Sequence, residues 1–162
     1  MAATVLFKIT GGVMIPEIEM PISATILELK KKIESVLKLK AERQTLRHHN
    51  QELNNGRTIA YYDFKKNVAT LVLHFKPLPG KPKFNVLVKS KYDEFNVKVK
   101  ETTLVADLFK EIEKRLRYSL IKNYNVYHLS TKIEEEDLPV TAYYICEGSN
   151  IEVKLKIWDR VV

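Results

Sequence analysis

The chain has 162 residues, of which 45% are apolar, and this fraction excludes an intrinsically disordered protein. Its net charge is +7. Residues 1–80 carry 12 Lys+Arg against 7 Asp+Glu, and residues 81–162 carry 15 against 13. No apolar run approaches the roughly 18 residues of a membrane span, and no secretory signal is recognisable. Cys146 is the only cysteine, which fits a reducing compartment, so we expect a cytoplasmic or nuclear protein without membrane association.

The first elements of the chain predict a hairpin. Val5, Phe7 and Ile9 recur at every second position, which is the pattern of a half-buried strand. A pair of glycines then turns the chain, and Pro16–Met20 forms a second strand with two glutamates on one side. A proline within a strand favours an edge position, where its missing N–H breaks no ladder bond.

A capped helix comes next. Thr25 and Glu28 have the spacing of a capping box, in which each side chain accepts a hydrogen bond from the backbone of the other. An apolar stripe then recurs at helical spacing, formed by Ile26, Leu29, Ile33 and Leu37.

Two strands complete this half of the chain. Gln44–His48 is predicted as a short strand in which Leu46 points inward, and a turn signal, Asn-Gly, follows it. The closing strand is Thr70–Phe75, and its alternation places Leu71, Leu73 and Phe75 inward. The side chains on its outer side are Val72, His74 and Lys76.

The same order of elements recurs about 80 residues further on, and such internal repetition predicts domains in tandem. We place the first domain at residues 1–77 and the second, more diverged one at 83–162, with a linker at 78–82. Three prolines in residues 77–82 predict a short, semi-extended spacer.

The first half resembles ubiquitin. Leu53–Phe64, which reads Leu-Asn-Asn-Gly-Arg-Thr-Ile-Ala-Tyr-Tyr-Asp-Phe, is similar to Leu-Glu-Asp-Gly-Arg-Thr-Leu-Ser-Asp-Tyr-Asn-Ile of that family. With the hairpin and the Thr-capped helix, the resemblance covers residues 4–76. It implies an α+β fold with two β-grasp (ubiquitin-like) domains in tandem, each a mixed sheet of four to five strands with one main helix. It also implies that the hydroxyl of Tyr62 is bonded to backbone near Asn54.

The second half follows the same plan less closely. We expect a hairpin of 84–88 and 95–99, a helix with Thr103 as its N-cap, and a third strand over Asn125–Leu129. The hydrophobic register, rather than the literal Ala-Tyr-Tyr of both halves, aligns Tyr143 with Tyr62.

Two departures from ubiquitin bear on function. A ubiquitin-type modifier is attached through a Gly-Gly end, because only glycine is narrow enough to enter the activating enzyme. Neither the linker, Pro-Leu-Pro-Gly, nor Lys156–Val162 contains Gly-Gly, so we expect a protein that is not conjugated.

The isoleucine at the centre of ubiquitin's apolar contact patch aligns with Arg47 in the first half and with His128 in the second. Burying an unpaired arginine against an apolar receptor costs several kcal/mol, so ordinary ubiquitin receptors are not expected to bind this face.

The positive charge in place of the apolar patch favours a different kind of partner. Such a face fits an acidic peptide or phosphate, and it equally fits a solvated surface. The residues that we expect to contact a partner protein are Arg47, His49, Val72, His74, Lys76 and His128.

Catalytic and metal chemistry are not expected. His48 and His49 should point to opposite sides of a strand and so cannot share a metal ion. The lone Cys146 has no evident base, and no Gly-rich phosphate loop or Ser/His/Asp arrangement occurs. We therefore predict a protein that is not an enzyme and needs no cofactor or metal.

The most favoured function is a non-conjugated tandem protein-interaction module, acting as a monomer. The resemblance implies an adaptor role in the ubiquitin–proteasome pathway, with two weak sites that gain affinity through effective concentration. The alternative is RNA binding through the basic face of the first domain and the linker lysines Lys76, Lys81 and Lys83. A third interpretation is a structural spacer in a larger assembly.

Overall fold

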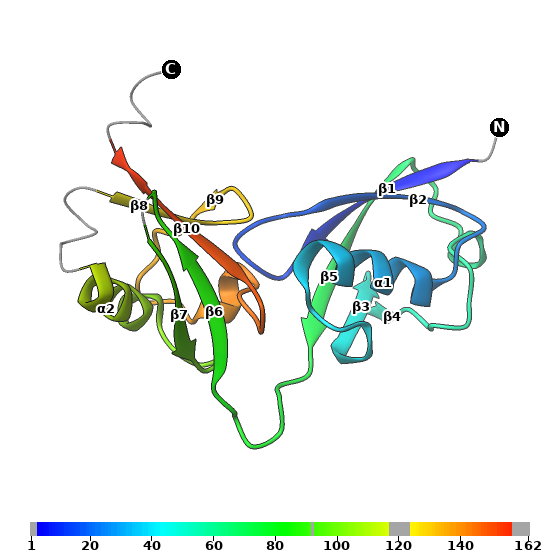
Figure 1. Ribbon diagram of the computed structural model, residues 1–162. Helices are drawn as coiled ribbons and strands as arrows, with labels where there is room; N and C mark the ends of the chain where they lie inside the picture. Colours follow the sequence, from blue (N-terminus) through cyan, green and yellow to red (C-terminus); the bar gives the residue numbers. More distant parts are fainter. Residues whose placement is uncertain (1–2, 92, 117–123, 157–162) are drawn as a thin grey trace. The chain divides into compact units, whose positions relative to one another are not determined.

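The computed structural model describes residues 3–91, 93–116 and 124–156. The chain divides into two compact units, Met1–Pro77 and Leu78–Val162. Within these residues, each unit has a five-stranded mixed sheet and an α-helix that crosses a face of it (Figure 1). This confirms the predicted α+β fold class with two similar domains. The limits 1–77, 78–82 and 83–162 remain our proposal for the domain and linker boundaries. No described helix is long and apolar enough to cross a membrane.

The first unit has the predicted order of elements. Its strands and helices are β1 (Thr4–Thr10), β2 (Glu17–Pro21), α1 (Ile26–Leu37), β3 (Gln44–His48), β4 (Gln51–Glu52) and β5 (Val68–Phe75), with 3-10 turns at Ala41–Arg43 and Ala60–Tyr62. The strand order is β2-β1-β5-β3-β4, and only the β1–β5 pair is parallel. β5 therefore lies at the centre of the sheet and β2 at one edge.

The core lies between α1 and one face of this sheet. The whole apolar stripe of α1 is buried, as are Phe7 and Ile9 of β1 and Leu71 and Leu73 of β5. The predicted capping box is present, because the N–H of Glu28 donates to Thr25 Oγ1 at 3.1 Å and the N–H of Thr25 donates to Glu28 Oε2 at 3.2 Å.

The resemblance to ubiquitin also predicted that the hydroxyl of Tyr62 is bonded to backbone near Asn54, and this is confirmed. The N–H of Asn54 donates to the hydroxyl oxygen of Tyr62 at 2.5 Å. The side-chain oxygen of Asn54 accepts a second hydrogen bond from the N–H of Gly56 at 3.0 Å, which closes the Asn-Gly turn.

The second unit repeats the arrangement. Its elements are β6 (Phe84–Lys89), β7 (Glu94–Val99), α2 (Val105–Leu116), β8 (Tyr124–His128), β9 (Thr131–Lys132) and β10 (Asn150–Leu155), with a 3-10 turn at Val140–Tyr143. The strand order is β7-β6-β10-β8-β9, and β10 is parallel to β6. β10 thus takes the place of β5, and β7 takes the place of β2.

Tyr143 occupies the position of Tyr62, as the hydrophobic register predicted. Its buried hydroxyl accepts hydrogen bonds from the N–H groups of Glu134, at 3.1 Å, and Glu135, at 3.0 Å. The acidic insertion therefore keeps the tyrosine contact, although its sequence differs from the Gly-Arg turn of the first half.

Two local predictions are wrong in the second unit. Thr103 is not the N-cap of α2, since its hydroxyl accepts from the N–H of Lys100 at 2.8 Å and the helix begins two residues later, at Val105. Leu104 takes the position of Thr25, as its bridge to Pro139 matches the bridge between Thr25 and Thr58. The third strand is Tyr124–His128 rather than 125–129, because Leu129 turns away with a φ of 49°.

The spacer is not simply extended. Gly80 and Lys81 have φ values of 75° and 47°, and the N–H of Lys81 donates to Leu78 O at 3.3 Å. The N–H of Leu78 donates to Glu101 Oε1 at 2.7 Å. A tight turn therefore separates Leu78 from the start of β6, and the predicted semi-extended conformation is wrong at this point.

We expect Tyr143→Phe to destabilise the second unit by roughly 1–3 kcal/mol, because it leaves two backbone N–H groups without their acceptor. Denaturant unfolding, followed through amide signals of each unit, measures this change. Tyr61→Phe serves as the control, since Tyr61 is 58% exposed. Equal effects of the two substitutions would contradict the structural role of the Tyr143 hydroxyl.

Candidate functional site

The exposed face of the first sheet carries most of the predicted contact residues. On β5, Val72 and His74 point away from the core, since they alternate with the buried Leu71 and Leu73. Arg47 of β3 lies directly opposite Val72 across the β3–β5 pair and is exposed as well. We define the outer face as Arg47, Val72, His74 and Lys76, which the structure brings together on two neighbouring strands and the residue after β5.

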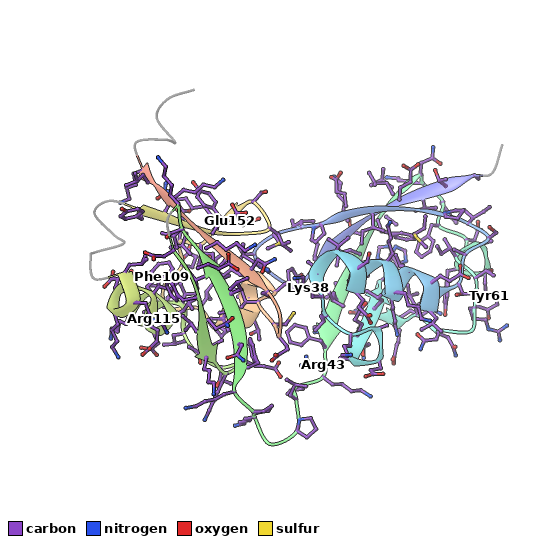
Figure 2. All side chains as sticks on the ribbon, in the orientation of Figure 1. Lys38, Arg43, Tyr61, Phe109, Arg115 and Glu152 are labelled. Atoms are coloured by element: carbon purple, nitrogen blue, oxygen red, sulfur yellow. The ribbon has the colours of Figure 1, made fainter. Side chains whose placement is uncertain are left out.

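The end of β5 is held firmly. The N–H of Lys76 donates to Arg43 O at 2.8 Å, and Arg43 Nε donates back to Lys76 O at 2.9 Å. The guanidinium of Arg43 also lies 5.5 Å from the centre of the Phe75 ring (Figure 2). The backbone of Lys76 is thereby fixed while its side chain remains exposed.

The outer face is not uniformly basic. Arg47 is flanked on its other side by Glu52, which lies opposite it on β4. Arg47 Nη1 also donates to Asn50 O, at 3.5 Å. Glu52 was not among the residues predicted from the sequence, although its position in the strand after the turn was the available signal. A carboxylate beside Arg47 offsets part of its charge at long range.

An apolar loop adjoins the same face. Thr10, at the end of β1, pairs with Val72, and the next residue, Gly11, has a φ of 123°. A Cβ at Gly11 would collide with Leu73 O, so glycine is required for the loop to pass this close to β5. The loop exposes Val13 and Ile15, which are 42% and 55% accessible. These apolar side chains were also missed, although they follow directly after the glycine pair.

The two adjacent histidines lie together, which corrects the prediction that they point to opposite sides. β3 ends at His48, and His49 adopts a left-handed turn conformation with a φ of 49°. The centres of their rings are 4.0 Å apart, and the centre of the His48 ring lies 4.9 Å from that of Phe64 in an edge-to-face arrangement. Burial, and then the neighbouring His49, lower the pKa of His48 below its usual value of 6.5. Among the described residues, no group of three His, Cys, Asp or Glu could hold a metal ion.

A groove of about 420 Å³ runs beside these rings. Its wall includes His49, Phe64, Lys65 and Lys66, together with Val68 and other residues at the start of β5. Val68 and Val72 share the outward side of β5, so the groove continues the outer face toward the N-terminal end of this strand. His49 therefore contributes to the groove and not to the cluster around Arg47.

His128 is wrongly predicted as a contact residue. It is only 2% exposed, and its Nδ1 lies 2.8 Å from Tyr143 O. In the β8–β10 register it faces the core opposite Ile151, whereas Tyr127 faces outward opposite Glu152. The alignment was off by one residue, and such a slip exchanges the two faces of a strand. Tyr127 is the counterpart of Arg47, with the ammonium of Lys154 5.4 Å from the centre of its ring.

We expect the first unit to lose stability as the pH falls through about 6.5. In this range the unfolded chain binds a proton at His48 that the folded chain takes up only at lower pH, so protonation favours unfolding. Denaturant unfolding between about pH 7.5 and pH 5.5 should show a larger loss for the wild type than for His48→Gln. Titration of the His48 ring signals checks the cause directly, and a midpoint at or above 6.5 would contradict it.

Comparison with known proteins identifies a matching family model for part of the first unit. Residues 9–78 match the model of the ubiquitin family. No curated protein matches the chain. Among solved structures, the chain is similar to the ubiquitin-like domain of Arabidopsis thaliana protein At2g32350, with 28% identity over 51% of this chain and 87% of that chain and a TM-score of 0.45. It is also similar to ATBAG1 in complex with HSP70, with 23% identity over 46% of this chain and 41% of that chain and a TM-score of 0.43. Residues 9–78 therefore form a ubiquitin-like domain, and the sheet of the second unit, outside the matched residues, has the same strand order.

Proposed function

We propose that the protein is a protein-interaction module, and that the outer face of its first domain docks onto an acidic segment of a partner protein. The observation that carries this proposal is the exposed pair of Arg47 and Val72, which lie directly opposite each other on β3 and β5. A ubiquitin-like domain at residues 9–78 supports a role in recognition rather than catalysis.

The chemistry of this face favours a partner that is both acidic and apolar. Val72 is 38% exposed, and Val68, on the same side of β5, is 45% exposed, so the strand offers apolar area along its length. Arg47 at the centre disfavours a purely apolar partner, because an unpaired buried arginine costs several kcal/mol. A carboxylate on the partner removes this penalty through a charge-assisted hydrogen bond.

The finer role that we propose is that of an adaptor in the ubiquitin–proteasome pathway, acting in the cytoplasm or nucleus as a monomer. Its support is the ubiquitin-like domain together with a second unit of the same strand order. Two recognition surfaces on one chain raise the local concentration of the second partner site once the first is bound.

Nothing in the described residues or the comparisons favours RNA binding. Proteins bind single-stranded RNA through aromatic rings that stack on its bases. The exposed ring of Tyr61 lies in the Ala60–Tyr62 turn, and the guanidinium of Arg57 is 4.4 Å from its centre (Figure 2). This ring is thus separate from the outer face and already has a cation against it.

We expect Arg47→Glu to abolish capture of the partner, because like charges then meet across the interface. The experiment would immobilise the 162-residue chain as wild type, as Arg47→Glu and as the control Lys31→Glu, and would measure the proteins that each retains by quantitative mass spectrometry. Lys31 is exposed on α1, so its substitution makes the same change in charge away from the outer face. The partner should be retained by the wild type and the control and reduced at least about tenfold on Arg47→Glu.

The same capture, repeated with nuclease and at two salt concentrations, separates this function from RNA binding. Retention that disappears with nuclease, or that falls steeply with salt to the same extent for every variant, would contradict the proposal. Equal retention on wild type and Arg47→Glu would contradict it as well.

A further inference from the structure

Among the residues that the structure describes, no strand pairs with the edge of the second sheet that lies beside α2. β7 lies at the end of the strand order β7-β6-β10-β8-β9, and it pairs with β6 over its full length, from Glu94 to Val99. A groove of about 790 Å³ follows this edge between β7 and α2. An edge strand presents a row of N–H and C=O groups that can pair with another chain.

The corresponding edge of the first domain is less open to an added strand. The N–H of Ile9 donates to Pro16 O and the N–H of Ile22 donates to Ala3 O, so the even-numbered residues of β2 face β1. The nitrogen of Pro21 then faces the open edge, and it has no N–H to donate. β7 is one residue longer and reads Glu-Phe-Asn-Val-Lys-Val, with no proline. The two domains therefore share a fold and differ at this edge, where β2 lacks one outward N–H and β7 lacks none.

The edge strand is anchored firmly on its inner side. Phe95, Val97 and Val99 are buried in the same core cluster as Leu108 and Ile112 of α2. Asn96 and Lys98 alternate with them and are exposed. A docked segment would therefore meet a rigid strand, and it would lose little free energy to ordering of the protein.

The walls of the groove are basic. Two of the lining residues are acidic, Asp107 and Glu111, whereas five are basic: Lys83, Lys98, Lys110, Lys114 and Arg115. Asp107 and Glu111 are already paired within α2, since their oxygens lie 3.9 Å from Lys110 Nζ and 3.1 Å from Lys114 Nζ. The guanidinium of Arg115 lies 4.8 Å from the centre of the Phe95 ring, at the point where α2 faces β7 (Figure 2).

We propose that this groove binds an extended acidic segment of another protein, which adds to β7 as a sixth strand. The backbone of β7 supplies the hydrogen bonds of the added strand, and the cations of β7 and α2 select glutamate or aspartate side chains. The site lies in the second domain, and it is separate from the outer face on which the proposed function rests. A nucleic acid or a free phosphate fits less well, because neither offers the alternating N–H and C=O groups that pair with a strand edge.

A synthetic peptide tests the proposal directly. The probe is an N-acetylated, C-amidated peptide of alternating valine and glutamate, titrated into the isotope-labelled 162-residue chain. We expect the largest amide shifts at 95–99 and slower hydrogen exchange of the β7 amides that point away from β6, because these become paired with the peptide. The double variant Lys98→Glu, Arg115→Glu should weaken binding at least about tenfold.

Three controls make the outcome decisive. Lys31→Glu with Lys32→Glu makes the same change in charge at exposed positions of α1 and should leave the affinity unchanged. A peptide with a central proline keeps the charges but lacks an N–H, so it should bind at least about tenfold more weakly. A peptide with lysine in place of glutamate should not bind.

Other results would overturn the inference. Equal binding of the proline peptide, or shifts without slower exchange on β7, would show attraction of any polyanion to a basic surface. Concentration-dependent shifts on β7 without peptide would identify a second copy of the chain as the occupant. Arg47→Glu should not change peptide binding here, so this site and the outer face of the first domain can fail independently.

Discussion

The pairing of the central strand with its antiparallel neighbour determines which residues each domain presents. In the first domain Leu46 lies opposite Leu73, and both are buried. Because side chains alternate along a strand, this pair places Arg47 and Val72 together on the outer face. A slip of β3 by one residue would bury Arg47 and expose Leu46, which is strongly unfavourable. The same apolar contacts that stabilise the core thus position the residues available for binding.

In the second domain the equivalent pair is Val126 and Val153, and it turns His128 inward. A buried histidine is tolerable only where its ring nitrogens find partners, and Tyr143 O lies 2.8 Å from Nδ1. Tyr143 therefore links two features, since its carbonyl contacts β8 and its hydroxyl accepts from the acidic loop at Glu134 and Glu135. The outward position is left to Tyr127, so the second sheet presents a ring where the first presents a cation.

Much of the fold could be predicted because strong apolar periodicity marks it. The stripe of α1, the alternation of β5 and the tyrosine contact at Tyr62 each follow from residues of one clear character. The register of β8 could not be predicted, because Tyr124–His128 is short and its tyrosines, asparagine and histidine are compatible with either side of a strand. His49 was misplaced for another reason: its left-handed conformation arises from the turn between β3 and β4, which residue type does not reveal. The groove along β7 depends on the distance between a strand and a helix, which no local pattern specifies.

Acidic residues accompany the cations at both proposed surfaces, and this affects selectivity. Glu52 lies beside Arg47, and Asp107 and Glu111 lie among the lysines of α2. At distances beyond about 10 Å such neighbours, together with salt, cancel most of the attraction for a diffuse polyanion. At contact distance a carboxylate of the partner still takes the place of these acidic neighbours beside the cations, provided that the backbone or apolar side chains of the partner also fit. Recognition at these surfaces therefore depends on shape and strand geometry more than on the net charge of +7.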